Sequence, residues 1–283
     1  MAEYFTARGL PVPRELQRSP LTDWRRLSVI AGAILVFYIG LRIVNPDLSR
    51  ANPAYAANVI LQLFKWDTSI LTPQNEFETF WNTAEGLMIA TIFLGIVATG
   101  FSIVVAIPLS FLGARNIMGG HPVTAAIYVL VRLIFTIIRS IDVLIVVIIC
   151  GVLIGIGTAA GVVGLAFHNV GVLGKLYSEA IEGIDPGPLE AITATGANRF
   201  QVIWTAVIPQ IVNPYISFTI YRLDANVRLA PILGYVGGGG IGVLFFQSIQ
   251  LLAYGAAGLI IFMIVVTVAA MDFASAQIRR RLL

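Results

Sequence analysis

The sequence has few charged residues and a single cysteine. Only 12% of its 283 residues are charged and 58% are hydrophobic, whereas roughly 25% of the residues of a soluble domain are charged. The lone Cys150 excludes an internal disulfide and a cysteine metal site, and we interpret it as a small buried hydrophobe. A composition this apolar predicts a polytopic membrane protein.

The chain also lacks the motifs of an enzyme. It has no G-x-x-x-x-G-K-[ST] loop and no H-E-x-x-H zinc motif, and the fragment nearest to a nucleotide-binding loop, Gly174-Lys175, continues with Leu176. Its two histidines, His121 and His168, are far apart and do not suggest a nucleophile–base pair. We therefore expect neither catalysis nor a cofactor in this chain, and no binding of nucleic acid.

Six stretches are apolar enough to cross a bilayer as helices, which takes about 20 residues each. They predict an all-α fold with six transmembrane helices: Leu27–Val44, Glu85–Leu112, Val123–Ile138, Val143–Phe167, Ile211–Leu233 and Ile249–Met271. The first stretch follows a long polar leader, so we expect a retained helix rather than a signal peptide, although Ala54-Tyr55-Ala56 resembles a cleavage site.

Basic residues set the expected orientation. With the N-terminus inside, the cytoplasmic segments hold most of the Lys and Arg, whereas the long outer loop has only Arg50 and Lys65 against four acidic residues. Both termini are then cytoplasmic, in a multi-pass protein of a bacterial cytoplasmic membrane. The expected organisation is a cytoplasmic segment 1–26, a first span 27–44, an extracytoplasmic loop 45–83, a core 84–271 and a basic cytoplasmic C-terminus 272–283.

The outer loop contains a short apolar stripe at helical spacing, made by Val59, Ile60, Leu63 and Phe64. This stripe predicts a helix that lies on the membrane surface or contacts a partner protein. A surface-lying connector is the simpler interpretation.

Residues 185–209 form a polar, helix-forming segment in the cytoplasm. Asp185-Pro186 is a helix start, and Gly196 is placed to end that helix in a left-handed conformation. Asn198 and Gln201 have the spacing of a capping box, which predicts a second helix that leads through Pro209 into the fifth span. Two short helices joined at an angle would make a rigid element suited to transmitting force; an ordinary interfacial loop is the alternative.

This segment, EAITATGANRFQVIWTAVIP, resembles the EAA loop of ABC importer permeases. Glu190, Ala191, Gly196 and Pro209 occupy the positions of that pattern, and apolar residues replace apolar ones at Ile192, Ala206 and Ile208. The flanking stretches SEAIEGIDPGPLEAITATGA, AVIPQIVNPYISFTIYRLDANVR and GYVGGGGIG are similar to the phosphonate-type permease subunit. The resemblance runs from about Ser140 to the C-terminus and is weaker before it.

The resemblance implies a type I permease with a fold like that of the methionine importer, working as a homodimer. It also implies two separate ATP-binding subunits, which bind the ATP and Mg, and an extracytoplasmic phosphonate or phosphate binding protein, with membrane lipid around the spans. The implied ATPase-coupling residues are Glu190, Ala191 and Gly196, with Asn198, Arg199 and Phe200 as neighbours. The expected cargo is phosphonate, phosphate or phosphite.

Charged residues inside the expected spans are costly and usually face a pore or a partner. The spacing of Arg139 and Asp142 and that of Asp224 and Arg228 allow pairing on one helix, and an excess of arginine remains. Guanidinium groups bind tetrahedral oxyanions by bidentate hydrogen bonds. We therefore expect a translocation pathway lined by five residues, unless these are structural or interfacial charges: Tyr221, Arg222, Asn226, Arg228 and Arg139.

A glycine cluster, Gly237–Gly240 with Gly242, precedes the last span. Its free amides suit either an anion cradle or a tight bend between helices, and the bend is the simpler interpretation. A secondary transporter or anion channel without an ATPase would have the same hydropathy. Such a protein would not need the rigid cytoplasmic element and often has duplicated halves, which this sequence lacks.

Overall fold

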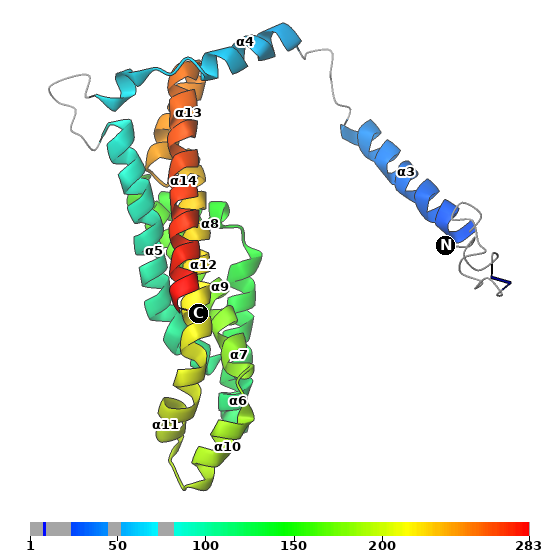
Figure 1. The fold of residues 1–283 in the computed structure, drawn as a ribbon, viewed down its shortest axis with the longest axis vertical. Coiled ribbons are helices and arrows are strands. Elements are labelled where there is room, and N and C mark those ends of the chain that lie inside the picture. Colours follow the sequence, from blue (N-terminus) through cyan, green and yellow to red (C-terminus); the bar gives the residue numbers. More distant parts are fainter. Residues whose placement is uncertain (1–7, 10–23, 45–51, 73–81, 283) are drawn as a thin grey trace. The chain divides into compact units, whose positions relative to one another are not determined.

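The computed structural model describes residues 8–9, 24–44, 52–72 and 82–282. The described residues are almost entirely helical (Figure 1), as the sequence predicts. The chain divides into two units, residues 1–57 and 58–283. The first contains α3 (Trp24–Val44), whose residues 27–44 are an apolar stretch long enough to cross a membrane.

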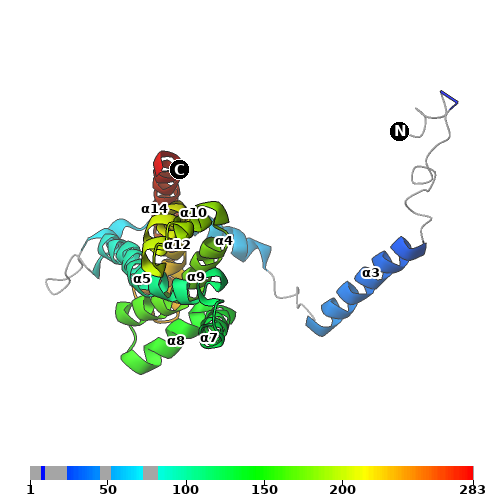
Figure 2. The ribbon, with the colours of Figure 1, turned by 90° about the horizontal axis from the view of Figure 1, so that it is seen from below.

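The second unit is a bundle of long helices. Seen along its axis in Figure 2, α7 and α8 lie on one side of α5, α9 and α12, and α14 lies on the other. α5 and α9 share the most extensive contact, and α12 packs against both. The bounds of the bundle helices are α5 (Ala84–Leu112), α7 (Pro122–Ser140), α8 (Val143–Ile154), α9 (Thr158–Glu182), α12 (Ile208–Tyr235) and α14 (Tyr254–Leu282).

Two of these helices, α7 and α8, lie one after the other along α9. Phe135 and Ile138 of α7 cover Gly174 and Gly171 of α9, and Val147 of α8 covers Gly164. At each of these glycines an added Cβ would come closer than 3.0 Å to the covering residue, so the absence of a side chain lets α7 and α8 pack directly on the backbone of α9. The covering residues advance from Phe135 to Val147 as α9 is followed backwards from Gly174 to Gly164, so α7 and α8 run antiparallel to α9. The two helices are separated by a break between Ser140 and Val143.

The third expected span, Val123–Ile138, agrees with α7, whereas the fourth is wrong as drawn. The stretch Val143–Phe167 is divided by a turn in which Gly155 and Gly157 have φ of +109° and +151°. α8 continues the direction of α7, and α9 runs back along both helices as far as Glu182. His168, which directly follows the end of the fourth expected span at Phe167, lies in the middle of α9.

The last expected span is displaced as well. Ile249–Met271 is divided by the end of α13 (Ile241–Gln250), and α14 begins only at Tyr254 and continues to Leu282. The expected basic C-terminal segment is thus largely a continuation of this helix. Five of the described helices are long and apolar enough to span a membrane, namely α3, α5, α7, α9 and α14. The more polar α12 has 28 residues but is not in that set, so the count of six stays a prediction.

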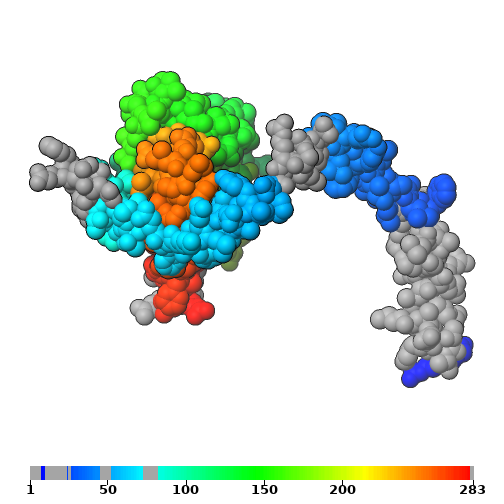
Figure 3. All heavy atoms as spheres, turned by 90° about the horizontal axis from the view of Figure 1, so that it is seen from above, coloured from blue at the N-terminus to red at the C-terminus, as the bar shows by residue number. Residues whose placement is uncertain are grey.

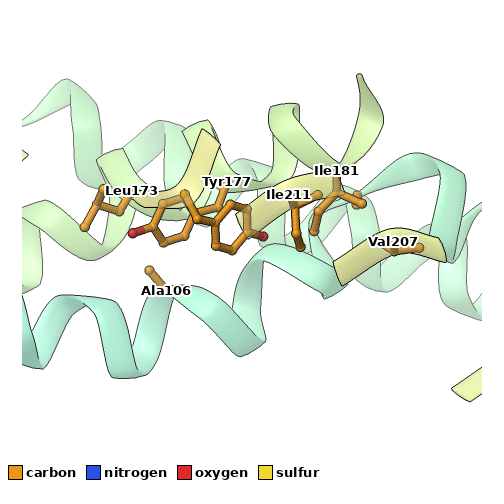
Figure 4. Packing of buried hydrophobic residues seen from close by; sticks show 8 residues of the cluster. Ala106, Leu173, Tyr177, Ile181, Val207 and Ile211 are labelled. Carbon is orange, nitrogen blue, oxygen red and sulfur yellow. The ribbon is translucent and has the colours of Figure 1, made fainter. Parts of the chain in front are cut away.

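The bundle core is anchored at its lower end by two tyrosines. The ring of Tyr177 (α9), labelled in Figure 4, is stacked on the ring of Tyr215 (α12), with centroids 3.9 Å apart and planes at 10°. Tyr215 is hydrogen-bonded to Ser110 of α5 at 2.7 Å, and Tyr177 to Thr219 of α12. These bonds join three helices inside a cluster of buried apolar residues that includes Leu173 and Ile181.

The opposite end of the bundle carries α13 and a segment of the outer loop, seen from above in Figure 3. The apolar stripe at Val59–Leu63 is helical, within α4 (Pro53–Leu63), as predicted, and a 3-10 turn, η2 (Thr68–Leu71), follows it. Gly258 of α14 lies against the Leu63 carbonyl and leaves no room for a side chain. The Trp66 and Phe262 rings are 4.6 Å apart, so the loop is held on α14.

Candidate coupling and transport sites

The segment between α9 and α12 has the architecture that its sequence predicts. α10 (Pro186–Ala194) begins at Asp185, whose carboxylate accepts a hydrogen bond from the Gly187 amide at 2.9 Å. The chain turns at Gly196, which has a φ of +83°, a left-handed value that favours glycine. Together with the Gln210 contact described next, these features define the coupling segment, residues 185–210.

The second helix of the segment, α11 (Arg199–Val202), starts with a complete capping box. Asn198 accepts from the Gln201 amide at 2.9 Å, and Gln201 accepts from the Asn198 amide at 2.8 Å. At the base of the segment, Gln210 accepts from the Asp185 amide at 2.9 Å and donates to the Ala206 carbonyl at 2.8 Å. Both ends of the coupling segment are therefore tied together.

A π-helical turn, η4 (Ile203–Val207), joins α11 to α12. Its cause is local: Pro209 has no amide hydrogen, so the α-helical bond to the Thr205 carbonyl cannot form. The preceding Ile208 amide bonds to the Ile203 carbonyl, five residues back, rather than to Trp204 as in an α-helix. The three elements form one continuous helical path, so a displacement of α11 passes directly to α12.

The coupling segment has an anchored face and a bare face. Leu189 and Ile203 pack against the apolar cluster of the bundle, and Val207 is buried in it. Phe200 and Trp204, by contrast, are 85% and 72% exposed. Two aromatic rings exposed on a rigid projection are typical of a protein-binding surface.

The remaining coupling residues predicted from sequence also lie on this projection. Glu190 and Ala191 are exposed on α10, and the Arg199 guanidinium approaches Gly120 in the turn before α7. α10 and α11 extend beyond the lower end of the bundle (Figure 1). The structure thus brings together in one projection all six predicted coupling residues: Glu190, Ala191, Gly196, Asn198, Arg199 and Phe200.

An ionic cluster fixes the nearby end of α9. Arg132 (α7) forms ion pairs with Glu182 and, at 3.6 Å, with Glu179, and its Nε donates to the Gly113 carbonyl at 2.9 Å. Glu182 also accepts from the Arg115 amide at 2.8 Å, at the start of α6 (Arg115–Met118). Arg132 is therefore fully engaged in holding α6, α7 and α9 together.

A polar network crosses the middle of the bundle. Arg222 (α12) donates to the side-chain oxygens of Asn169 (α9) and, at 3.5 Å, of Asn226. Asn226 donates in turn to Thr99 of α5 at 2.8 Å. Asn169 and Asn226 are completely buried, so the network fixes Arg222 between three helices.

Arg228 occupies a different setting, one turn and a half further along α12. It bonds Asp224 at 3.0 Å, as its spacing predicts, and also Asp272 of α14 at 2.8 Å. Tyr221 is 56% exposed. Arg228 thus joins α12 to α14, whereas Arg222 faces α9 and α5.

The expected pair of Arg139 and Asp142 is wrong. Asp142 instead caps α8, where it accepts from the Leu144 amide at 2.8 Å. Arg139 takes part in none of the ion pairs between described residues. It nevertheless lies within electrostatic reach of Arg222, and both arginines are within reach of His168.

Comparison with known proteins identifies the family. The family model described as "Binding-protein-dependent transport system inner membrane component" matches residues 117–283, more than half of the sequence. The chain belongs to this family. Its helical fold is similar to that of the inward-facing MetNI methionine ABC transporter, with a TM-score of 0.61 at 23% identity, over 71% of this chain and 96% of the other.

Individual relatives are named for phosphorus compounds. The chain is 34% identical to the phosphate-import permease protein PhnE of Mycolicibacterium smegmatis, over 97% of this chain and 55% of that protein. It is also 34% identical to the phosphite transport system permease protein PtxC of Stutzerimonas stutzeri, over 68% and 69%. The cryptic phosphonate transport system permease PhnE2 of Escherichia coli, itself a putative assignment, is 44% identical over 41% and 95%. The chain thus spans about half the length of the mycobacterial relative.

Sequence reasoning missed two members of the polar network, Thr99 and Asn169, and also His168, which precedes Asn169 in the chain. His168 and Asn169 could have been recognised from the sequence as a polar pair that directly follows an apolar run. Because we ended the fourth span at Phe167, both fell outside the membrane. A polar residue within a span is costly and would otherwise have stood out.

Proposed function

We propose that this chain is the permease subunit of an ATP-driven ABC importer for phosphonate or a related phosphorus oxyanion, phosphate or phosphite. The family of inner membrane transport components supports the class of protein. The names of relatives at 34–44% identity, which refer to phosphate, phosphite and phosphonate, support the class of cargo. In this proposal two copies of the chain form the pore, and a binding protein delivers the cargo from outside.

The coupling segment is the observation that carries the proposal. An ATPase outside the bilayer must move a membrane helix through a stiff connection, and residues 185–210 supply one. Gln210 closes the base of the segment, the capping box fixes α11, and η4 continues without a loop into α12. Phe200 and Trp204 offer the ATPase an exposed aromatic contact at the tip.

The proposed pathway follows α12, which the coupling segment drives. Arg222 and Asn226 face α9 and α5 inside the bundle, and Arg139 lies within electrostatic reach. These three residues fit a route for anions better than Arg228, which two carboxylates neutralise. Tyr221 is exposed and available to a second copy of the chain.

Cross-linking tests the coupling proposal. Cys150 is the only cysteine, so a Cys150→Ser background permits single reporter cysteines. In the complex with its ATPase, Phe200→Cys should cross-link to an ATPase cysteine. The matched control is Leu251→Cys, equally exposed at 79% but at the opposite end of the bundle. Cross-linking from Leu251 and not from Phe200 would contradict the proposal. It would also contradict the expected orientation, in which both termini are cytoplasmic.

Uptake measurements test the function. Proteoliposomes that contain the chain, the ATPase and the binding protein should accumulate phosphate, phosphite or methylphosphonate only with hydrolysable ATP. The ATP and Mg belong to the ATPase subunits, so the chain alone should neither hydrolyse ATP nor transport. Uptake by the chain alone would identify a secondary transporter or a channel instead.

A further inference from the structure

The four arginines of α7 and α12 fall into two classes. Arg132 and Arg228 each contact two carboxylates, which neutralise them. Arg222 and Arg139 contact none among the described residues. Arg139 is exposed, whereas Arg222 is partly buried; an uncompensated guanidinium inside a transmembrane bundle is costly, and an anion from elsewhere would stabilise it.

The partners of Arg222 supply hydrogen bonds and no negative charge. Its Nη2 binds the oxygens of Asn169 and Asn226, and Asn226 is held in this orientation because its amide nitrogen donates to Thr99 at 2.8 Å. Thr99 donates onward to the Gly95 carbonyl at 2.7 Å. This series of hydrogen bonds fixes the orientation of the guanidinium, including its Nε, which takes no part in them.

Donors remain free at the same place. Arg222 Nε and Asn169 Nδ2 are buried and have no hydrogen-bond partner among the described residues, and the same holds for His168 Nδ1. Asn169 is 0% exposed, so bulk water does not compensate its amide. A buried donor left unpaired costs about 1–3 kcal/mol, which is why native proteins seldom keep several together without a ligand.

The backbone is interrupted at the same level. α7 ends at Ser140 and α8 begins at Val143, and this break lies beside α9 between the contacts Ile138–Gly171 and Val147–Gly164. His168 lies between those two glycines in sequence and within electrostatic reach of Arg139, Asp142 and Arg222. At the break the N-terminus of α8, capped by Asp142, follows the C-terminus of α7, and interrupted helices of this kind occur at the substrate sites of transporters.

We propose that Arg222 Nε and Asn169 Nδ2, together with His168 and the positive charge of Arg139, form a binding site for the cargo oxyanion in the middle of the bundle. This inference rests on the proposed function and adds to it a cargo-binding site within the permease itself. A tetrahedral oxyanion presents several acceptor oxygens to the two free donors. Its charge balances an arginine pair that the single carboxylate of Asp142, engaged as the α8 cap, does not neutralise.

Anion binding by the chain itself gives the first test. The purified chain in detergent should show a higher thermal midpoint with millimolar phosphate or methylphosphonate than with sodium chloride of equal ionic strength. Asn169→Leu and Arg222→Gln should abolish this rise. Arg280→Gln, the same change at an exposed arginine of α14, should retain it. A rise that persists in both site variants would overturn the proposal.

Arg222→Lys covers the case in which Arg222→Gln does not fold. It keeps the charge but loses the planar fork and its Nε–H, so the apparent affinity should fall about tenfold, equivalent to roughly 1.4 kcal/mol. Unchanged affinity in this variant would show that Nε does not bind the anion.

Uptake separates a failure of the site from a failure of the function. In proteoliposomes, Arg222→Lys and Asn169→Leu should slow ATP-dependent uptake at least tenfold relative to Arg280→Gln. If the unaltered complex imports the anion and both site variants match Arg280→Gln, the site is wrong and the function stands. If the unaltered complex imports none of the phosphorus oxyanions, the proposed function itself is wrong.

Discussion

Gln210 binds both backbone groups of Asp185 across the base of the coupling segment. Its side-chain oxygen accepts from the Asp185 amide at 2.9 Å, and its nitrogen lies 3.4 Å from the Asp185 carbonyl. The two residues are separated by the whole of α10, α11 and η4, so one side chain closes a long projection into a ring. A closed ring transmits a push at its tip to α12, whereas an open one would bend.

Replacing Gln210 by Leu should uncouple transport from ATP hydrolysis. The change removes three hydrogen bonds of a partly buried side chain, each worth about 1 kcal/mol, and leaves Phe200 and Trp204 in place. The ATPase should therefore still bind, while uptake per ATP hydrolysed falls several-fold. Pull-down with the ATPase and the ratio of uptake to phosphate release measure the two effects. Normal coupling in this variant would mean that the base of the segment need not be closed.

Gly196→Val should disturb the angle between α10 and α11. Gly196 has a φ of +83°, and a side chain in that region costs roughly 1–2 kcal/mol. No atom lies within 4 Å of the position where its Cβ would be, so backbone strain is the only penalty. We expect weaker ATPase binding with an unchanged thermal midpoint of the bundle.

The matched control for that variant is Gly187→Ala, on α10 of the same segment. Gly187 has no positive φ, and its added Cβ would be 3.4 Å from the nearest atom, an ordinary separation. ATPase binding should therefore be unaffected. If both variants bind the ATPase normally, the left-handed turn is not required for docking.

The coupling segment was predictable because its signals are local. Asp185, Gly196 and the Asn198–Gln201 capping box act on residues within a few positions of themselves, so short-range rules place them correctly. The pairing of Gln210 with Asp185 was not foreseen, since nothing in either sequence neighbourhood specifies a contact across 25 positions.

The bundle was harder to predict because a turn between two apolar helices does not lower the hydropathy of the stretch that contains it. The turn at Gly155–Gly157 lies within the expected span Val143–Phe167, which hydropathy reads as continuous, whereas the break at Ile141–Asp142 falls at the expected boundary between the third and fourth spans. The decisive evidence is the contact of Gly164, Gly171 and Gly174 with α7 and α8, which depends on distant residues. The hydrogen bond between Asn226 and Thr99, which are 127 positions apart, could not be predicted for the same reason.

Tyr215→Phe should lower the stability of the bundle by about 1 kcal/mol, the usual net value of one buried hydrogen bond. The change removes the bond to Ser110 at 2.7 Å and preserves the ring stacked on Tyr177. The thermal midpoint in detergent measures the loss. Tyr235→Phe is the control on the same helix: its ring is 60% exposed and packs edge-on against Phe246. An equal midpoint in both variants would show that the Ser110 bond contributes nothing net.

Arg132→Met should destabilise the chain more strongly than any other single loss of charge at the lower end of the bundle. It removes the ion pairs with Glu182 and Glu179 and the bond to Gly113, at a site where the Arg132 side chain is only 19% exposed. A partly buried carboxylate loses its cation, so we expect a cost of about 2 kcal/mol, which is a fall in thermal midpoint of roughly 4–8 °C.

Lys175→Met is the matched comparison, because it removes one positive charge from the same cluster. Lys175 contacts only Glu179, at 3.8 Å, and both side chains are more exposed, at 32% and 48%. Solvent screens such a pair, and its contribution is at most about 1 kcal/mol. A midpoint that falls equally in the two variants would mean that Arg132 acts as an ordinary surface charge. A larger fall in Arg132→Met alone would show that this residue holds α7 against the end of α9 from which the coupling segment begins.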